Sequence, residues 1–414
     1  MWRRFMSSKW YKQPVITGIG ITTASGQGKT SVTSSLLKGQ TSFGIMQREG
    51  RQHTSAFIGA ELGMLLPPER IAPKLFRSAS LSGKAALITL ADAWEDAKLD
   101  AVPPARIGLI VGGSNVQQRE ALLVHEKYRD RQRFITPAYG ISFMDTDICG
   151  LCTEQFGIRG HAYTLGAASA SGQAAILQAV MAVESGQVDV CIALGALMDL
   201  SYWELQSFKS LGALGSERFA SQPELACRPY DIDRDGFIYG ESCGAVVIES
   251  NASSKARGVR HYAVLKGGAM YMDGHRNPDP SFEGESYVIN HALQQAGITA
   301  AEIDYVNPHA TGSRIGDETE LDALRNCRLE HAFINTTKSV LGHGLTAAGC
   351  VELIAVLLQM EAGMLHPSVN LDNPIDNNFN WVRQQAVTHQ ITHAITLSFG
   401  FGGMNTALVI SAPL

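Results

Sequence analysis

The chain has no long run of charge of one sign and no long run of apolar residues. Its 414 residues include 34 Lys and Arg and 39 Asp and Glu, which gives a net charge of −5 at pH 7. Proteins that hold nucleic acid usually carry a basic patch, so this balance does not indicate nucleic-acid binding. No stretch reaches the roughly 18 consecutive apolar residues of a membrane helix, and we expect no membrane span.

The chain has few cysteines, and their spacing forms no pattern. There are 7 of them, an odd number, and several lie in apolar stretches, as Cys191 does in Val190–Leu194. Such cysteines are typical of buried free thiols in a reducing compartment. Residues 1–10 are basic but lack a following apolar region, so we expect no signal peptide and a cytoplasmic protein.

The sequence gives no sign of a metal or a bound nucleotide. Asp231–Gly236 resembles the start of a calcium loop, but the twelfth position of that loop is Ser242 and not a bidentate glutamate. Gly26–Thr30 resembles the end of a P-loop, but the position that requires a glycine is Thr23. We therefore predict that the protein binds no metal and carries no cofactor.

The length of the chain and an internal repeat indicate two fused α/β units. In the first half, a helix-like run over 87–97 leads to an apolar strand over 107–111. In the second half, a similar run over 287–296 leads to a strand over 303–306. Short apolar strands alternate with helices along the rest of the chain, which is typical of a layered α/β protein.

Two apolar runs strengthen the repeat. One begins at Gly172 and stops at Gly186, and the other begins at Gly349 and stops at Gly363, so both pairs are 14 apart. Each run is apolar almost all round, which predicts a buried helix, and each closing glycine suits a helix C-terminus.

The repeat predicts an N-terminal half over 1–255 and a C-terminal half over 256–414. The stretch near 114–165 has no obvious equal in the second half. We predict that it is an insertion that caps a pocket or builds a subunit interface.

Four segments supply candidate site residues. Ser169 precedes a predicted buried helix, where amide groups and the helix dipole favour negative charge. His309 follows a predicted strand, and His343 is flanked by glycines and lies five residues after Lys338. The loop 398–405 contains three glycines and could present N–H groups to an anion. Each feature also has an ordinary explanation, namely a helix cap, a structural histidine or a plain turn.

The order of these motifs resembles the β-ketoacyl synthase (condensing enzyme) family of the thiolase fold, from about residue 13 to the C-terminus. The segments that carry the resemblance are Arg228–Glu241, Val306–Glu320, Lys338–Glu352 and Ser398–Asn405. The resemblance implies a duplicated fold of α/β/α layers with central mixed sheets, and a homodimer.

The resemblance also implies roles for the site residues. Position 169 would carry an acyl chain if it were Cys, and His309 and His343 would hold the malonyl thioester carbonyl. Lys338, paired with Glu352, would orient the site. The N–H groups of Ser169 and Phe401 would form the oxyanion hole, and the supporting residues would be Glu352, Asp317, Phe399 and Asn405. The chain departs from the pattern at Ala310, where the family often has Gly, and at Leu397, where it often has Asn.

The main departure is Ser169 itself. A serine hydroxyl is a weak nucleophile without a dedicated base, so we expect acyl loading and condensation to fail. Decarboxylation needs donors to an enolate oxygen, and both histidines remain to supply them. The sequence is similar to ketosynthase-like decarboxylases of polyketide β-branching cassettes, which convert malonyl-acyl carrier protein to acetyl-acyl carrier protein.

This similarity implies several partners. The substrate would be carried on the phosphopantetheine arm of an acyl carrier protein, and a synthase resembling HMG-CoA synthase would use the product. Such carrier proteins are usually acidic, so we expect a basic docking patch, with Arg70, Lys74 and Arg77 as possible contributors.

Three other functions remain open at this point. The chain could be a condensing enzyme whose cysteine has been replaced by serine. It could be a non-catalytic partner subunit that resembles chain-length factors, although those usually lose the histidines as well. It could also be an acyltransferase in which Ser169 forms an ester with His309 or His343 as base.

Overall fold

The computed structural model describes residues 10–413. Residues 1–9, which hold most of the basic segment behind the signal-peptide prediction, lie outside the described residues.

The helices and strands alternate along the chain, as the sequence predicts. The α-helices are α1 (Lys29–Lys38), α2 (Pro73–Ser78), α3 (Leu81–Asp96), α4 (Gln118–Tyr128), α5 (Tyr139–Ser142), α6 (Thr146–Phe156), α7 (Ser171–Glu184), α8 (Tyr202–Ser210), α9 (Asn251–Arg257), α10 (Phe282–Ala296), α11 (Arg314–Asn326), α12 (Lys338–Leu341) and α13 (Ala348–Ala362). The longer strands are β1 (Pro14–Thr23), β5 (Ile107–Gly112), β6 (Ala162–Leu165), β7 (Val190–Gly195), β9 (Ser242–Ser250), β10 (Ala263–Met272), β16 (His393–Gly400) and β17 (Met404–Ser411). The shorter strands are β2 (Gly26–Gln27), β3 (Gly44–Ile45), β4 (Ile58–Ala60), β8 (Tyr239–Gly240), β11 (Tyr305–Asn307), β12 (Phe333–Ile334), β13 (Met364–Leu365), β14 (Asn380–Trp381) and β15 (Val387–Thr388). Two 3₁₀ helices matter for the site, namely η5 (Ala168–Ala170) and η9 (Leu345–Ala347).

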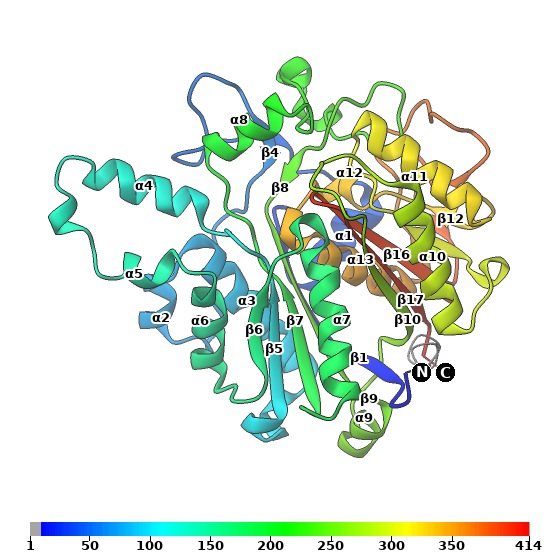
Figure 1. Cartoon of the computed structure of the whole chain (residues 1–414), viewed down its shortest axis with the longest axis horizontal. Coiled ribbons are helices and arrows are strands. Elements are labelled where there is room, and N and C mark those ends of the chain that lie inside the picture. The colour runs from blue at the N-terminus through cyan, green and yellow to red at the C-terminus, as the bar shows by residue number, and fades with distance from the viewer. Residues whose placement is uncertain (1–9, 414) are drawn as a thin grey trace.

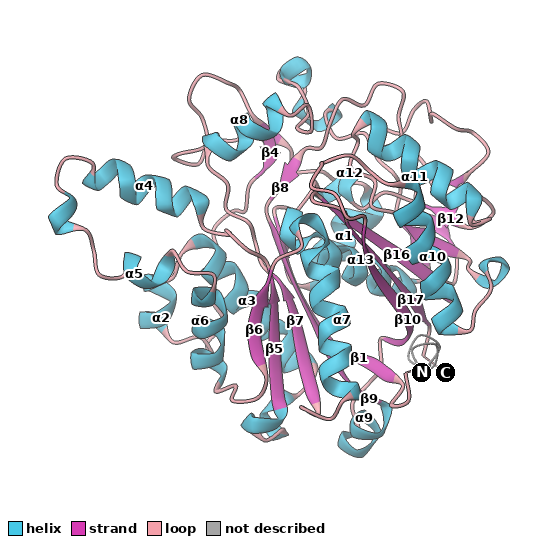
Figure 2. Ribbon diagram, in the orientation of Figure 1, coloured by secondary structure: helices cyan, strands magenta, loops and turns pink. Residues whose placement is uncertain are grey.

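The main sheet consists of two halves with the same arrangement (Figure 2). The strand order is β1-β9-β7-β5-β6 in the first half and β10-β17-β16-β11-β12 in the second, where β14 follows β12. In each half the first two pairings are antiparallel and the next two are parallel. Strands β1 and β10 join the halves through the pairs Val15–Val264 and Ile16–Ala263. The duplicated architecture predicted from the repeat is therefore confirmed.

The helices form three layers around these two half-sheets (Figure 1). Helices α7 and α13 lie in the middle and pack against each other and against strands of the sheet. Helix α3 covers β1 and β9, and α10 covers β10 and β17. One hydrophobic cluster fills the centre around α7 and α13, and two others lie under α3 and under α10 and α11. The predicted α/β fold class, with layers around mixed sheets, is confirmed.

One segment is long and apolar enough to cross a membrane, judged by length and composition alone, although polar residues interrupt it. It covers Leu345–Ala362 and has a mean hydropathy of 1.6 over 18 residues. In the structure 89% of this window is buried, because it contains α13 in the central layer. The apolar run therefore belongs to the protein core.

The segment without a counterpart is shorter than the predicted 114–165. Helix α6 and strand β6 take the places that α11 and β12 take in the second half. The remaining part, with α4 and α5, projects from the body of the protein (Figure 1). It exposes the apolar side chains of Phe134, Ile141, Phe143 and Met144. Its role as a cap or subunit interface stays a prediction.

The two central helices approach each other closely at a pair of glycines. Gly172 in α7 and Gly349 in α13 hold the same position in the two halves. A Cβ on Gly349 would lie 2.4 Å from the backbone N of Gln173, and one on Gly172 would lie 2.7 Å from that of Cys350. Backbone atoms in a close-packed core cannot move aside alone, so these glycines set the distance between the halves.

We predict that Gly349→Ala destabilises the protein, because its methyl group meets backbone. Overpacking of this kind costs about 1–3 kcal/mol, measured as the change in the free energy of unfolding in urea. The matched control is Gly150→Ala in α6, where a Cβ would have nothing within 4 Å. That variant should be neutral or more stable, by up to about 1 kcal/mol. Equal effects of the two substitutions would contradict the prediction.

Candidate active site

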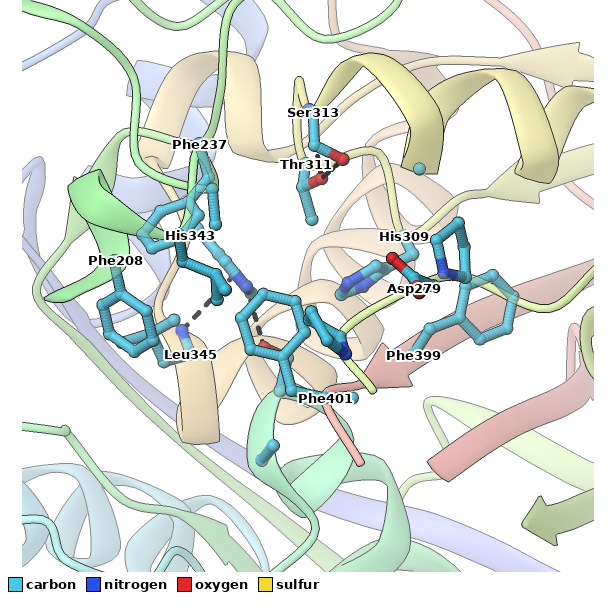
Figure 3. Close-up of a pocket in the computed structure, with 18 of the residues that line it drawn as sticks. Phe208, Phe237, Asp279, His309, Thr311, Ser313, His343, Leu345, Phe399 and Phe401 are labelled. Atoms are coloured by element: carbon cyan, nitrogen blue, oxygen red, sulfur yellow. Dashed lines mark hydrogen bonds between the residues drawn. The ribbon is translucent and has the colours of Figure 1, made fainter. Parts of the chain in front are cut away.

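A cavity of about 650 Å³ brings together candidates from both halves of the chain (Figure 3). Ser169 and His343 line it, as do His309, Phe399 and Phe401. In Figure 3, Phe208 and Phe237 lie on the His343 side, whereas Phe399 and Asp279 lie on the His309 side. The cavity therefore has an aromatic wall at each end and the two histidines between them.

Ser169 lies in the 3₁₀ turn that directly precedes the buried helix α7. Ser171 closes this turn, because its Oγ donates to the carbonyl of Ala168 (2.7 Å) and accepts from the N–H of Ala167 (2.9 Å). From the second half, Ser398 Oγ donates to the carbonyl of Ser169 (3.0 Å). Ser169 is thus fixed from both halves at a helix N-terminus, where developing negative charge is favoured.

The loop between β16 and β17 packs on the same turn. A Cβ on Gly400 would lie 2.4 Å from the carbonyl oxygen of Ala167, so the two backbones are in close contact. Phe401 follows, with its ring centroid 6.3 Å from that of Phe208. The N–H groups of Ser169 and Phe401 belong to these neighbouring segments, and their role as an oxyanion hole stays a prediction.

His343 is buried, and its hydrogen bonds indicate which ring nitrogen carries the proton. Its Nε2 lies 3.0 Å from Ser169 Oγ, and its Nδ1 accepts from the N–H of Leu345 at 3.4 Å. Burial, and then the nearby Lys338 charge, hold the pKa of His343 well below its usual range, so the ring is neutral. A neutral ring whose Nδ1 accepts has its proton on Nε2. His343 therefore donates toward Ser169 and the cavity.

His309 is the second neutral imidazole of the site. Its ring centroid lies 5.5 Å from that of His343, with 82° between the ring planes. Burial lowers its pKa well below the usual range, and the charge of Lys338 and the presence of His343 lower it further. Its backbone N–H donates to Glu320 Oε1 at 2.6 Å, and that of Ala310 donates to Glu320 Oε2 at 2.8 Å. Glu320 thus holds the backbone of His309 and Ala310 in place.

Asp317 holds the next part of the same loop. Its carboxylate accepts from the N–H groups of Gly312 (3.0 Å) and Tyr230 (2.7 Å), and Arg234 Nε lies 3.6 Å away. Burial raises the pKa of Asp317 to about 7 in spite of these donors. Tyr230 also donates its hydroxyl to Glu320 at 2.6 Å, so the carboxyl groups of Asp317 and Glu320 belong to one network.

Lys338 connects His309 to the central helix α13. Its Nζ donates to the carbonyl of His309 and to Glu352 Oε1, and both residues of this ion pair are buried. Burial raises the pKa of Glu352 to about 7, whereas the Lys338 charge acts in the opposite direction. Lys338 therefore positions His309 through its backbone and lowers the pKa of both histidines.

Three non-glycine residues at the site have left-handed backbone. Ala168 (φ 47°) precedes Ser169, Ala310 (φ 43°) follows His309, and Leu345 (φ 52°) is the donor to His343. Such residues cost about 1–3 kcal/mol each and persist where the surrounding structure fixes them. The value at Ala310 also explains why a glycine would suit this position.

Family comparison agrees with this geometry. The model described as "Beta-ketoacyl synthase, N-terminal domain" matches residues 12–254, and "Beta-ketoacyl synthase, C-terminal domain" matches residues 262–372. The chain belongs to the β-ketoacyl synthase family. The predicted resemblance is therefore confirmed.

Members of this family that are similar to the chain include decarboxylating and condensing enzymes. The polyketide biosynthesis malonyl-ACP decarboxylase PksF of Bacillus subtilis (strain 168) is 58% identical over 396 residues, which is 96% of this chain and 95% of that protein. The 3-oxoacyl-[acyl-carrier-protein] synthase 1 of Buchnera aphidicola subsp. Acyrthosiphon pisum (strain APS) is 32% identical and covers 96% of this chain and 99% of its own.

Solved ketosynthase structures have the same fold. A beta-ketoacyl synthase from Burkholderia phymatum STM815 superimposes with a TM-score of 0.88 at 25% identity, over 97% of this chain and 100% of that one. A type II polyketide ketosynthase in complex with its acyl-carrier protein superimposes with a TM-score of 0.84 at 25% identity, over 97% and 99% of the two chains. The thiolase-like fold expected from the resemblance is confirmed.

The structure brings almost all the predicted residues of this ketosynthase-like site together. Asn405 also lines the cavity, where its amide donates to Asp273 at 2.9 Å. Arg70, one of the residues expected in a basic docking patch, pairs with Asp100 at 2.7 Å, and the patch stays a prediction. Sequence reasoning did not find Glu285, which lies in the cavity wall on α10. No local motif marks it.

We predict that Lys338→Met destabilises the protein by about 3–5 kcal/mol, because it leaves Glu352 buried without a partner. The pKa of Glu352 would then rise further above its value in the unfolded chain. A carboxyl group with a raised pKa loses stability as pH rises, so the loss should be larger at alkaline than at acid pH. Urea unfolding at several pH values measures this change.

The control is Lys338→Met combined with Glu352→Gln, which removes the buried charge. This double variant should recover part of the lost stability and show little of the pH dependence. If the loss of stability in Lys338→Met, relative to the wild type, were the same at all pH values, the assigned ion pair would be contradicted.

Proposed function

We propose that this protein decarboxylates malonyl-acyl carrier protein to acetyl-acyl carrier protein and supplies acetyl units for β-branching in polyketide biosynthesis. The observation that carries the proposal is the combination of Ser169 at the nucleophile position with two neutral histidines in one cavity. The identity of 58% over nearly the whole length to a malonyl-ACP decarboxylase supports it.

The hydrogen bonds of His343 argue against condensation through an acylated serine. An acyl-serine requires a base that takes the hydroxyl proton as the bond forms. The Nε2 of His343, which faces Ser169 Oγ, already carries a proton, because Nδ1 accepts from Leu345. His343 therefore cannot take that proton in this tautomer, and the same argument disfavours a serine acyltransferase with His343 as base.

The same arrangement suits decarboxylation. When the bond between the α-carbon and the malonyl carboxylate breaks, its electron pair moves into the thioester carbonyl and creates an enolate oxyanion. An Nε2–H from His343, with His309 beside it, would donate to this oxygen as negative charge develops. Burial keeps both rings neutral, so each ring has one N–H to donate.

The expected partners follow from this reaction. The malonyl group would reach the cavity on the phosphopantetheine arm of an acyl carrier protein. A ketosynthase neighbour was solved in complex with such a carrier, which supports a carrier-protein partner here. A homodimer, a downstream synthase resembling HMG-CoA synthase and a cytoplasmic location complete the proposal.

Intact-mass spectrometry of malonyl-carrier protein tests the reaction directly. We expect the protein to convert it to acetyl-carrier protein, with no acyl adduct on the protein itself. His309→Ala and His343→Ala should each lower kcat by about 10²–10³-fold, because each removes a donor to the enolate oxygen. Malonyl-carrier protein that stays intact with the wild-type protein would contradict the proposal.

Variants at Ser169 separate decarboxylation from condensation. Ser169→Ala should keep kcat within about tenfold of the wild type, because only the backbone N–H of residue 169 has an assigned role. Ser169→Cys should gain an acyl adduct when it is incubated with an acyl thioester, because a thiol is far more nucleophilic. Loss of decarboxylation in Ser169→Ala to the level of His343→Ala would instead assign the hydroxyl a direct role.

A further inference from the structure

Glu285 is a carboxyl group in the cavity wall that the reaction as described so far does not use. It lies in the first turn of α10 and is only 1% exposed. Its Oε2 is buried and has no hydrogen-bond partner among residues 10–413. A buried polar atom without a partner is costly, so its presence beside a substrate cavity requires an explanation.

Contacts across two strands place Glu285 at the His309 end of the cavity. A Cβ on the adjacent Gly284 would lie 2.6 Å from the side-chain amide of Asn405. Asn405 pairs with Phe399 across β16 and β17, and the ring of Phe399 lies 5.5 Å from that of His309. The carboxyl group and the histidine therefore border the same part of the cavity.

Glu285 differs from the other carboxyl groups near it. Asp317 and Glu320 accept backbone N–H donors, and such bonds favour the ionised form. Asp273, at the end of β10, accepts the amide of Asn405. Glu285 has no comparable donor in the described chain.

Its surroundings favour the neutral acid. Burial raises the pKa of Glu285 well above its usual range, and the negative charges of Glu320, Asp273 and Asp317 raise it further. These three groups, from α11 and from the end of β10, are the titratable neighbours that face it. Glu285 therefore holds a proton under conditions in which ordinary glutamates have lost theirs.

The proposed reaction needs such a proton. Loss of carbon dioxide leaves an enolate whose α-carbon must gain a proton to become an acetyl group. Both histidines are neutral donors at the oxygen, and a neutral imidazole is a weak acid. A neutral carboxylic acid is a much stronger proton donor.

We propose that Glu285 supplies the proton that replaces carbon dioxide on the α-carbon, through water in the cavity. This inference rests on the proposed decarboxylation. The α-carbon takes a proton from the water, which takes the proton of Glu285. The Glu285 carboxylate then regains a proton from solvent, so each turnover releases carbon dioxide and consumes one proton.

Glu285→Gln tests this role, because the amide keeps the size of the side chain but cannot deliver an acidic proton. We expect kcat for malonyl-carrier protein to fall by about 10²-fold or more, with KM little changed. Glu285→Asp should recover part of kcat. The matched control is Glu283→Gln, on the same helix but exposed, which should leave kcat unchanged. A kcat for Glu285→Gln equal to that of this control would overturn the proposal.

The pH dependence of kcat gives a second test. As pH rises through the raised pKa of Glu285, its proton is lost and kcat should fall. Asp317 and Glu352 also have raised pKa values, so they could contribute to a fall in kcat at alkaline pH. The fall is assigned to Glu285 because Glu285→Gln should not show it. A wild-type kcat that stays constant with rising pH until the protein unfolds would overturn the inference.

The two proposals fail in different ways. If the wild-type protein releases no carbon dioxide from malonyl-carrier protein, the proposed decarboxylase function itself is contradicted. If the wild-type protein and Glu285→Gln decarboxylate malonyl-carrier protein equally fast, only the role of Glu285 as proton donor is contradicted.

Discussion

The close contact of α7 and α13 is the constraint on which the rest of the structure depends. Gly172 and Gly349 let the two helices meet at backbone distance in their first turns. Ser169 stands just before α7, and His343 stands just before the 3₁₀ turn that leads into α13. The contact therefore sets the distance between a residue of the first half and a residue of the second. The two helices are equivalent elements of the duplicated halves, and the close contact at their glycines brings residues of both halves into one cavity.

The electrostatics of the site follow from burial on both sides of this contact. Lys338 is a cation in the protein interior, and it is accommodated because Glu352 and the carbonyl of His309 accept its donors. Its charge disfavours a proton on either histidine, so both rings remain neutral. In the proposed reaction, the site would consequently stabilise an oxyanion with neutral donors. Such donors are effective in a buried cavity because they need little reorganisation during the reaction.

The sequence predicted the duplication and most of the site, because both depend on local signals. Glycine spacing at Gly172, Gly186, Gly349 and Gly363 marked the equivalent helices, and short motifs marked His309 and His343. The tautomer of His343 could not be predicted, since it depends on a left-handed backbone at Leu345. Glu285 has no motif either, because its environment comes from α11, β10 and β17. Features created by distant parts of the chain leave no trace in residue spacing.

The distribution of sulfur has a consequence for how the protein responds to its chemical surroundings. All seven cysteines are free and buried, and burial raises the pKa of each thiol. Alkylating agents and peroxides react with exposed thiolates, and the residue that faces His343 in this cavity is a serine, Ser169. Electrophiles that inactivate a ketosynthase through its active-site thiol therefore have no target here. A cavity with a serine beside His343, in a protein whose thiols are all buried, offers such reagents no exposed thiolate.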